Sequence, residues 1–309
     1  MMPPAPAVTR ALMILQFGQL VATAWQGPDL PGNTLRTHFV PAYFGGPGSP
    51  ALLFLESGEQ VALEWPKGLP PRVHFLASSR DGRAVYVQGL AFSSSEITKV
   101  EFDPQQQFAV PGTKGLGQLS SLVESTLPQR LIALTVPNKG GASAAYTIDE
   151  TTGVRSHLSF GSMNDCGPVS PDGQHALCYE EGEMVLMDGK SGKARTVPGM
   201  RNRTAITWSS WSPDGRWIAL NDNGALTSID SDNPSQKKHL GSGGKGPPVW
   251  SPDSARILVS KSELSCAITL YGLSLEVIEV ETGKKNVIRG SHCRIMGGSY
   301  GWLNRDLAQ

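Results

Sequence analysis

A turn motif that recurs along the chain restricts the possible folds more than any other feature of this sequence. The clearest copy is Trp-Ser-Pro-Asp-Gly-Arg-Trp-Ile-Ala-Leu at residues 211–220. The positions that align with its aspartate, spaced 47, 44, 42 and 39 residues apart, are Asp81, Pro128, Asp172, Asp214 and Asp253. Ser, Pro, Asp and Gly in this order favour a tight turn. The apolar run that follows each turn predicts a strand buried on both faces, which we expect to be the innermost strand of its sheet.

A second pattern repeats with the same period. A strand that ends in an acidic residue, followed by a turn and another strand, occurs six times, and the acidic positions are Glu56, Asp103, Asp149, Asp188, Asp230 and Glu281. This pattern is typical of a hairpin. Two interleaved patterns with one period indicate a repeat architecture.

A repeat of about 45 residues made of four short strands is typical of a β-propeller blade. Residues 25–309 number 285, which gives about 47 for each of six blades. We therefore predict an all-β fold, a six-bladed β-propeller of four-stranded antiparallel blades. Either residues 302–309, where Trp302 aligns loosely with Trp211, or residues 37–44 could close the ring.

The repeat at residues 211–220 resembles the WD-like repeat of TolB propellers, and it is similar to the propellers of prolyl-oligopeptidase-type enzymes. The resemblance covers about residues 33–309 and is strongest over 165–285. It implies the propeller fold. TolB carries an additional N-terminal α/β domain, for which residues 25–309 leave no room, so the resemblance implies TolB's role in an envelope complex only weakly.

The first residues are typical of an export signal. Residues 1–24 contain one charged side chain, Arg10, then an apolar stretch over 11–20 and a small-x-small sequence before Trp25. The apolar stretch is too short to span a bilayer. We therefore expect a signal peptide at 1–24 and a periplasmic or secreted propeller, with a disordered or surface-packed N-terminus as the alternative.

The four cysteines fit this localisation, because an even number in an exported chain favours disulfides. The two expected pairs are Cys166 with Cys178 and Cys266 with Cys293. Four buried thiols are the alternative.

Residue patterns that carry chemistry are sparse. Gly297–Gly301 matches the G-x-S-x-G nucleophile elbow, but too few residues follow it to supply a helix and a histidine. The repeat aspartates Asp81, Asp172, Asp214 and Asp253 are best explained as turn residues. The oxygen-rich segments 221–224 and 230–233 could hold calcium, but they lack the full loop of a calcium site. We expect no cofactor, with calcium as the one candidate.

The expected function is that of a non-catalytic binding or scaffold module that engages a protein or an envelope component. Equal numbers of basic and acidic residues, 27 each, argue against nucleic acid as the partner. The loop 262–274, taken as a first-to-second-strand loop, is unusually apolar, and its candidate partner residues are Leu264, Ile268, Leu270 and Tyr271. A loop folded back on the propeller and held by Cys266 is the alternative. Two alternatives remain: a calcium-dependent lactonase- or phosphotriesterase-like hydrolase, and a regulatory propeller detached from a peptidase.

Overall fold

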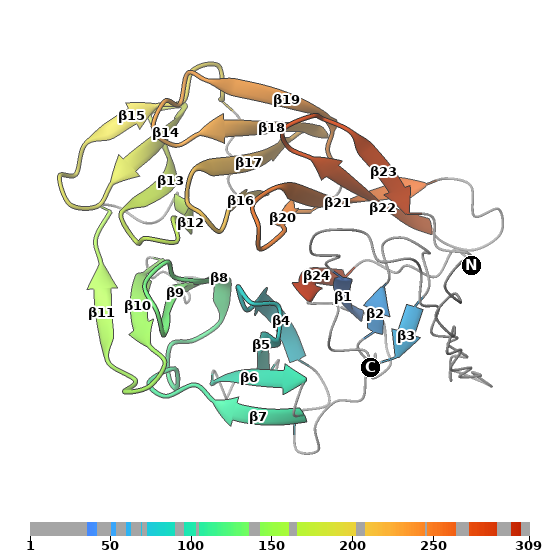
Figure 1. Cartoon of the computed structure of the whole chain (residues 1–309). Coiled ribbons are helices and arrows are strands. Elements are labelled where there is room, and N and C mark those ends of the chain that lie inside the picture. Colours follow the sequence, from blue (N-terminus) through green and yellow to red (C-terminus); the bar gives the residue numbers. More distant parts are fainter. Residues whose placement is uncertain are drawn as a thin grey trace, which may run out of the picture.

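The fold was obtained as a computed structural model of the chain and consists of short antiparallel strands (Figure 1). The structure describes residues 36–41, 51–53, 60–62, 69, 73–89, 96–102, 105–135, 143–160, 166–201, 208–244, 246–263, 272–288 and 298–303. Within these ranges, no helix is long and apolar enough to cross a membrane. The expected signal peptide at 1–24 lies outside them.

Five sheets are each built from four strands that are consecutive in the chain, and we call them the first to fifth blades. The first blade has β4 (Val73–Ser78), β5 (Ala84–Gly89), β6 (Ile97–Phe102) and β7 (Gln105–Ala109); the second has β8 (Leu119–Glu124), β9 (Arg130–Thr135), β10 (Ala145–Asp149) and β11 (Arg155–Leu158). The third has β12 (Cys166–Val169), β13 (His175–Glu180), β14 (Glu183–Asp188) and β15 (Ala194–Thr196); the fourth has β16 (Ser209–Trp211), β17 (Trp217–Asp222), β18 (Ala225–Asp230) and β19 (Lys237–Ser242); the fifth has β20 (Val249–Trp250), β21 (Arg256–Glu263), β22 (Gly272–Glu279) and β23 (Lys285–Ile288). The chain is therefore a β-propeller of four-stranded antiparallel blades.

A further four-stranded sheet joins the two ends of the described chain, and we call it the terminal sheet. Its order is β24 (Gly298–Leu303), β1 (Arg36–Pro41), β2 (Ala51–Leu53) and β3 (Gln60–Ala62). Among the described residues, the blades of consecutive strands number five, one fewer than the six expected, because the terminal sheet takes its first strand from the other end of the chain. Both segments considered for closure, 37–44 and 302–309, contribute to this sheet, since β1 and β24 pair along their whole length.

The repeat turn does not precede the innermost strand, contrary to the expectation from sequence. In the third, fourth and fifth blades it connects the first strand to the second, for example β16 to β17 around Pro213. Figure 1 shows that the first strands β4, β8, β12, β16 and β20 gather around the centre together with β24. The second strands are nevertheless buried on both faces, because each face of a blade packs against a neighbouring blade.

The hydrophobic core lies between neighbouring blades rather than inside any one of them. The cluster between the fourth and fifth blades, for example, contains Leu226 and Leu240 on one side and Ile257, Val259 and Ile278 on the other. Equivalent clusters lie between the first and second, second and third, and third and fourth blades. The outermost strands are mostly exposed, as in β15. Each blade therefore depends on its neighbours to bury its apolar side chains.

Tryptophan indoles connect the innermost strands of successive sheets. The Nε1–H of Trp211 donates to the carbonyl oxygen of Pro168 at 2.9 Å, and that of Trp250 donates to Ser210 at 3.1 Å. Trp302 of β24 is buried and makes the same contact with Val249 of the fifth blade at 3.1 Å. The terminal sheet is thus attached to the fifth blade in the same way as the fourth is to the third.

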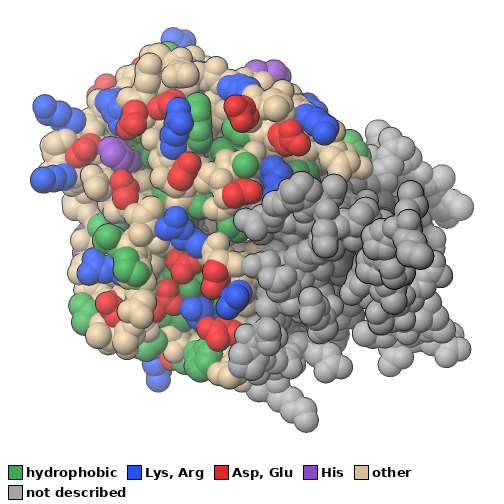
Figure 2. Space-filling model, in the orientation of Figure 1, with side chains coloured by type: hydrophobic (Ala, Val, Ile, Leu, Met, Phe, Trp, Pro, Cys, Tyr) green, Lys and Arg blue, Asp and Glu red, His purple; other side chains and the backbone are tan. Residues whose placement is uncertain are grey.

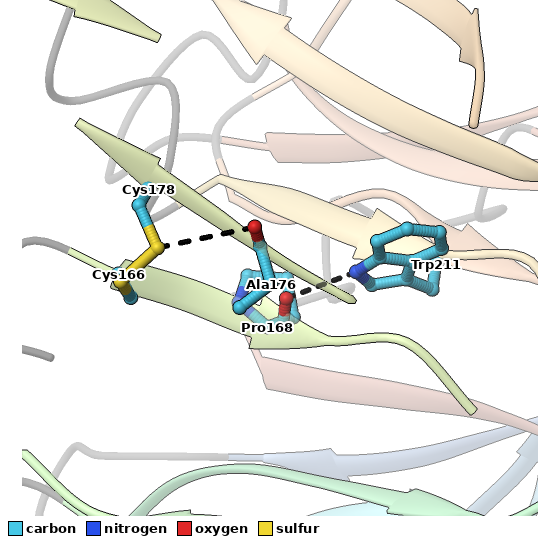
Figure 3. The surroundings of a disulfide bond; sticks show 5 residues. All are labelled: Cys166, Pro168, Ala176, Cys178 and Trp211. Carbon is cyan, nitrogen blue, oxygen red and sulfur yellow. Dashed lines mark hydrogen bonds between the residues drawn. A yellow bond between two sulfur atoms is a disulfide. The ribbon is translucent and has the colours of Figure 1, made fainter. Parts of the chain in front are cut away.

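One disulfide connects the first two strands of the third blade (Figure 3). Cys166 of β12 and Cys178 of β13 are directly opposite each other in the ladder, and their Cα atoms are 3.9 Å apart. The pair closes a short loop that contains the repeat turn. The first expected cysteine pair is therefore present, whereas Cys266 and Cys293 lie outside the described residues.

Candidate functional site at the junction of the first and second blades

The repeat aspartates lie in turns, as the sequence indicates. In the fourth blade, Ser212 Oγ donates to Asp214 Oδ1 at 2.5 Å, and this oxygen also accepts the N–H of Arg216 at 3.0 Å. The Ser212 Oγ in turn accepts the N–H of Trp217 at 2.8 Å. The same network occurs around Asp81, Asp172 and Asp253. These carboxylates therefore hold turns together.

The repeat turn of the second blade differs from the other repeat turns. The sequence pattern assigned its aspartate position to Pro128, which is one residue too late. Ser125 takes the place of the repeat serine, because its N–H donates to the carbonyl oxygen of Arg130 at 2.8 Å just as the other repeat serines bond to the residue five positions later. The position of the repeat aspartate is therefore Leu127, not Pro128. Leu127 is 49% exposed, so this turn presents an aliphatic side chain where the others present a carboxylate. The left-handed residue here is Gln129, at φ 56°, one position later than the left-handed residue of the other repeat turns.

The second repeated position, the acidic residue at the end of the third strand, is confirmed for Asp149, Asp188 and Asp230. The Oδ1 of Asp149 accepts the N–H groups of Thr151 and Thr152 at 3.0 and 2.7 Å. These bonds, with those of Thr152 first, lower the pKa of Asp149 below its usual range. Asp188 makes the same turn and has a lowered pKa for the same reason, with Ser191 as its main donor.

In the fifth blade the equivalent acidic residue is Glu279 and not Glu281. The N–H of Glu279 donates to Lys284, and its carbonyl oxygen accepts from Gly283, as Asp149 does with the residues five and four positions later. The sequence pattern pointed to Glu281 because Glu279 and Glu281 are both glutamates near the same turn. Glu56 and Asp103 lie outside the described residues.

The oxygen-rich segment 230–233 bonds to its own backbone, whereas Asn221 of the segment 221–224 bonds to a neighbouring loop through its nitrogen, and its buried Oδ1 accepts no hydrogen bond from the described residues. Asp230 Oδ1 accepts the N–H groups of Asp232 and Asn233 at 2.9 and 3.1 Å, and Asn221 Nδ2 donates to the carbonyl oxygens of Gly244 and Gly246. Within the described ranges, no group of three or more His, Cys, Asp or Glu side chains is placed to hold a metal ion.

Other predicted site residues fall in or near undescribed segments. Residues 264–271, with Leu264, Ile268, Leu270 and Tyr271, lie outside the described residues. The strands that flank them, β21 and β22, are the second and third of the fifth blade, so this is a second-to-third-strand loop. The serine of the G-x-S-x-G sequence, Ser299, is part of β24 and pairs with β1, so it does not occupy a strand-to-helix turn.

Charged side chains gather where the first and second blades meet, a site that the sequence did not indicate. The phenol of Tyr86, on β5, donates to Glu150 Oε2 at 3.0 Å across the junction. Lys99, on β6, lies 3.6 Å from the same carboxylate and 3.8 Å from Glu101. Glu124, at the end of β8, accepts the backbone N–H of Arg80 in the first blade. Figure 2 shows acidic and basic side chains gathered over the surface around β8 and β9.

The carboxylate of Glu124 is electrostatically unfavourable at this position. Burial raises the pKa of Glu124 above its usual range, the hydrogen bond from Arg80 acts against this increase, and the nearby Glu150 raises the pKa further. The Tyr86 phenol also has a raised pKa, first because it is buried and then because Glu124 and Glu150 lie close to it. Lys99 is a cation that lowers the pKa of Glu124.

Glu124 also departs from the repeat. It precedes the repeat serine, where the third, fourth and fifth blades have the buried apolar residues Val169, Trp211 and Trp250. Glu150, which follows the acidic turn residue, aligns with small or apolar residues in those blades: Gly189, Ser231 and Val280. Comparison of aligned repeat positions could have found these glutamates from the sequence. The first blade has the half-buried Ser78 at the position of Glu124, so the apolar residue is present in three of the described blades. Departures from such a pattern are expected at functional sites.

Comparison with solved structures identifies propellers of the same fold. The chain is similar to TolB from Acinetobacter baumannii, with 15% identity and a TM-score of 0.59 over 88% of this chain and 68% of that one. It is also similar to a putative TolB from Agrobacterium tumefaciens, with 13% identity and a TM-score of 0.53 over 89% and 98% of the two chains. A chain of a nidogen/laminin complex matches with 10% identity and a TM-score of 0.55 over 87% and 98%.

These likenesses establish that the chain has the fold of TolB-like β-propellers. At such low identities they establish the fold alone. No protein-family model matches the sequence, and no curated protein matches it either.

Proposed function

We propose that this chain is a non-catalytic β-propeller module that binds a protein or an envelope component in the cell envelope or the extracellular space. The observation that carries the proposal is the distribution of polar side chains over the repeats. The repeat carboxylates are used in turns, whereas Glu124 and Glu150, which depart from the repeat, both contact the first blade from the second. Charged side chains that depart from an architectural repeat are candidates for binding a partner.

The proposed compartment is supported by the disulfide and by the fold. Disulfides persist in oxidising compartments such as the periplasm, and Cys166 and Cys178 form one. TolB-like propellers share the fold. We expect residues 1–24 to direct export, so the mature chain isolated from its source begins near Trp25. A cytosolic chain that retains residues 1–24 would contradict this part of the proposal.

The terminal sheet is proposed to act as a sixth blade that closes the ring. Its strand β24 contacts β20 on one side and β4 on the other. Trp302 supplies the same indole contact that Trp211 and Trp250 supply between consecutive blades. Closing the ring leaves fewer exposed strand edges, which would otherwise pair with other chains.

The experiment that tests the proposed function is proximity labelling from the chain in its native cells, followed by direct binding of each labelled protein to the purified chain. A specific partner that binds saturably to the folded chain supports the proposal. Failure of every labelled protein or envelope component to bind the purified chain would exclude it.

A further inference from the structure

We infer that the chain forms a symmetric dimer through β7, the outermost strand of the first blade, which pairs antiparallel with β7 of a second copy. β7 ends the sheet order β4-β5-β6-β7, so one side of its backbone has no partner strand among the described residues. Figure 1 shows β7 at the rim of the propeller, and its residues 106, 108 and 109 are exposed. An edge strand directs every second N–H and C=O away from its sheet, where they can pair with another chain. The dimer does not depend on the proposed partner binding.

β7 lacks the features that protect the other outermost strands from pairing. Its sequence is Gln-Gln-Gln-Phe-Ala, whereas β11, β15, β19 and β23 each contain a lysine or an arginine. β3 is also uncharged, but it has only three residues. Charged side chains, short length and bulges are the usual means by which proteins keep edge strands apart. All five residues of β7 pair with β6 without a register shift, so β7 is a regular and uncharged edge.

The sequence of β7 is complementary to its own copy. Antiparallel pairing centred on Gln107 places this residue opposite itself and uses the whole length of the strand. Gln106 of each copy then lies opposite Phe108 of the other. Phe108 is 45% exposed, and the two Phe108 rings become diagonal neighbours on one face, within reach of each other. Both rings lose exposed apolar surface in the pair, which favours association.

The charges on the neighbouring strand β6 also permit this pairing. Lys99 is the cross-strand neighbour of Phe108, and Glu101 is that of Gln106. Each row of side chains across the combined sheet therefore has Lys99 of one copy at one end and Glu101 of the other copy at the other end. The row through Gln107 carries no charge. Since no row brings like charges together, a second copy fits this edge, in line with the prevalence of two-fold dimers among protein assemblies.

Sedimentation velocity of the purified chain, over a concentration series that reaches the high micromolar range, tests the inference. The wild type should shift reversibly from the mass of a monomer to twice that mass. The dimer should be weak, because one strand pair buries less surface than a typical stable interface. Phe108→Ala should weaken the dimer by at least about fivefold. Val287→Ala is the matched control, since Val287 is also 45% exposed and lies on the outermost strand β23, and it should leave the dimer unchanged.

A charge exchange at the symmetry axis identifies the strand that pairs. Gln107→Lys places two lysines opposite each other, and Gln107→Glu places two glutamates there, so each variant alone should remain monomeric. An equimolar mixture of the two variants should restore the dimer, because lysine then faces glutamate. Asn286→Lys, which adds a lysine to the exposed strand β23, is the control and should dimerise as the wild type does.

Three results would overturn the inference. The first is a wild type that stays monomeric at every concentration, and the second is a dimer that Phe108→Ala does not weaken. The third is a mixture of folded Gln107→Lys and Gln107→Glu that stays monomeric. Thermal unfolding shows whether each variant folds. If either variant of Gln107 does not fold, the comparison of Phe108→Ala with Val287→Ala decides.

Discussion

Replacing Ser212 by alanine should destabilise the propeller far more than replacing the neighbouring Asp214 by asparagine. Ser212 is fully buried, donates to Asp214 at 2.5 Å and accepts the backbone N–H of Trp217 at 2.8 Å. Ser212→Ala removes a hydrogen bond to a charged group and leaves the Trp217 N–H without its side-chain acceptor. Together these losses amount to about 2–4 kcal/mol of unfolding free energy.

Asp214→Asn should cost less than about 1 kcal/mol, because an asparagine oxygen still accepts the N–H of Arg216 and Asp214 is exposed. Both values are measured by urea unfolding followed by tryptophan fluorescence. A loss below about 0.5 kcal/mol for Ser212→Ala, or a larger loss for Asp214→Asn than for Ser212→Ala, would refute the explanation of the repeat as a turn-forming unit.

Three further predictions follow from single contacts. Replacing both Cys166 and Cys178 by serine, or reducing the wild type, should lower the unfolding free energy by about 3 kcal/mol, because the disulfide closes a short loop in the unfolded chain. Trp302→Phe should cost about 1 kcal/mol or more by removing the bond to Val249, as measured by urea unfolding. Glu124→Gln should stabilise the chain at neutral pH, because folding raises the pKa of Glu124 and so disfavours its charged form; the gain should disappear as the pH falls below the usual range of a glutamate.

Each of these predictions has an outcome that would contradict it. If reductant did not lower the free energy of unfolding, the disulfide would not stabilise the folded chain. Unchanged stability of Trp302→Phe would argue against the terminal sheet as a sixth blade. For Glu124→Gln, destabilisation at neutral pH would show that the carboxylate is favourably paired in the folded chain, contrary to the raised pKa of Glu124.

The parts of the fold that depend on local chemistry could be predicted from the sequence. The turns at Asp172, Asp214 and Asp253 follow from side chains that bond to their own backbone within a few residues, and the period between them indicates blades. The sequence did not show which strand of a blade is innermost. The second strand is buried on both faces, because neighbouring blades cover both faces of each blade, so its apolar run resembles that of an innermost strand. The position of Leu127 was missed because the turn around Gln129 lacks the aspartate that marks the others.

The candidate site was harder to predict because it is formed between blades. Glu124 and Glu150 are ordinary glutamates in the sequence, and only the packing of the first blade against the second brings Tyr86 and Lys99 to them. The signal in the sequence was the departure of Glu124 and Glu150 from the residues at the aligned positions of the third, fourth and fifth blades. Burial, which raises its pKa, becomes visible only in the structure.

The central claim, that the chain binds a partner and leaves it chemically unchanged, is tested most directly by titrating the purified mature chain with a partner identified by proximity labelling. Isothermal titration calorimetry measures the binding, and mass spectrometry of the recovered partner measures any chemical change. Saturable binding with a partner of unchanged mass is the predicted result. A partner that is cleaved or otherwise modified by the chain would contradict the account and identify the propeller as an enzyme.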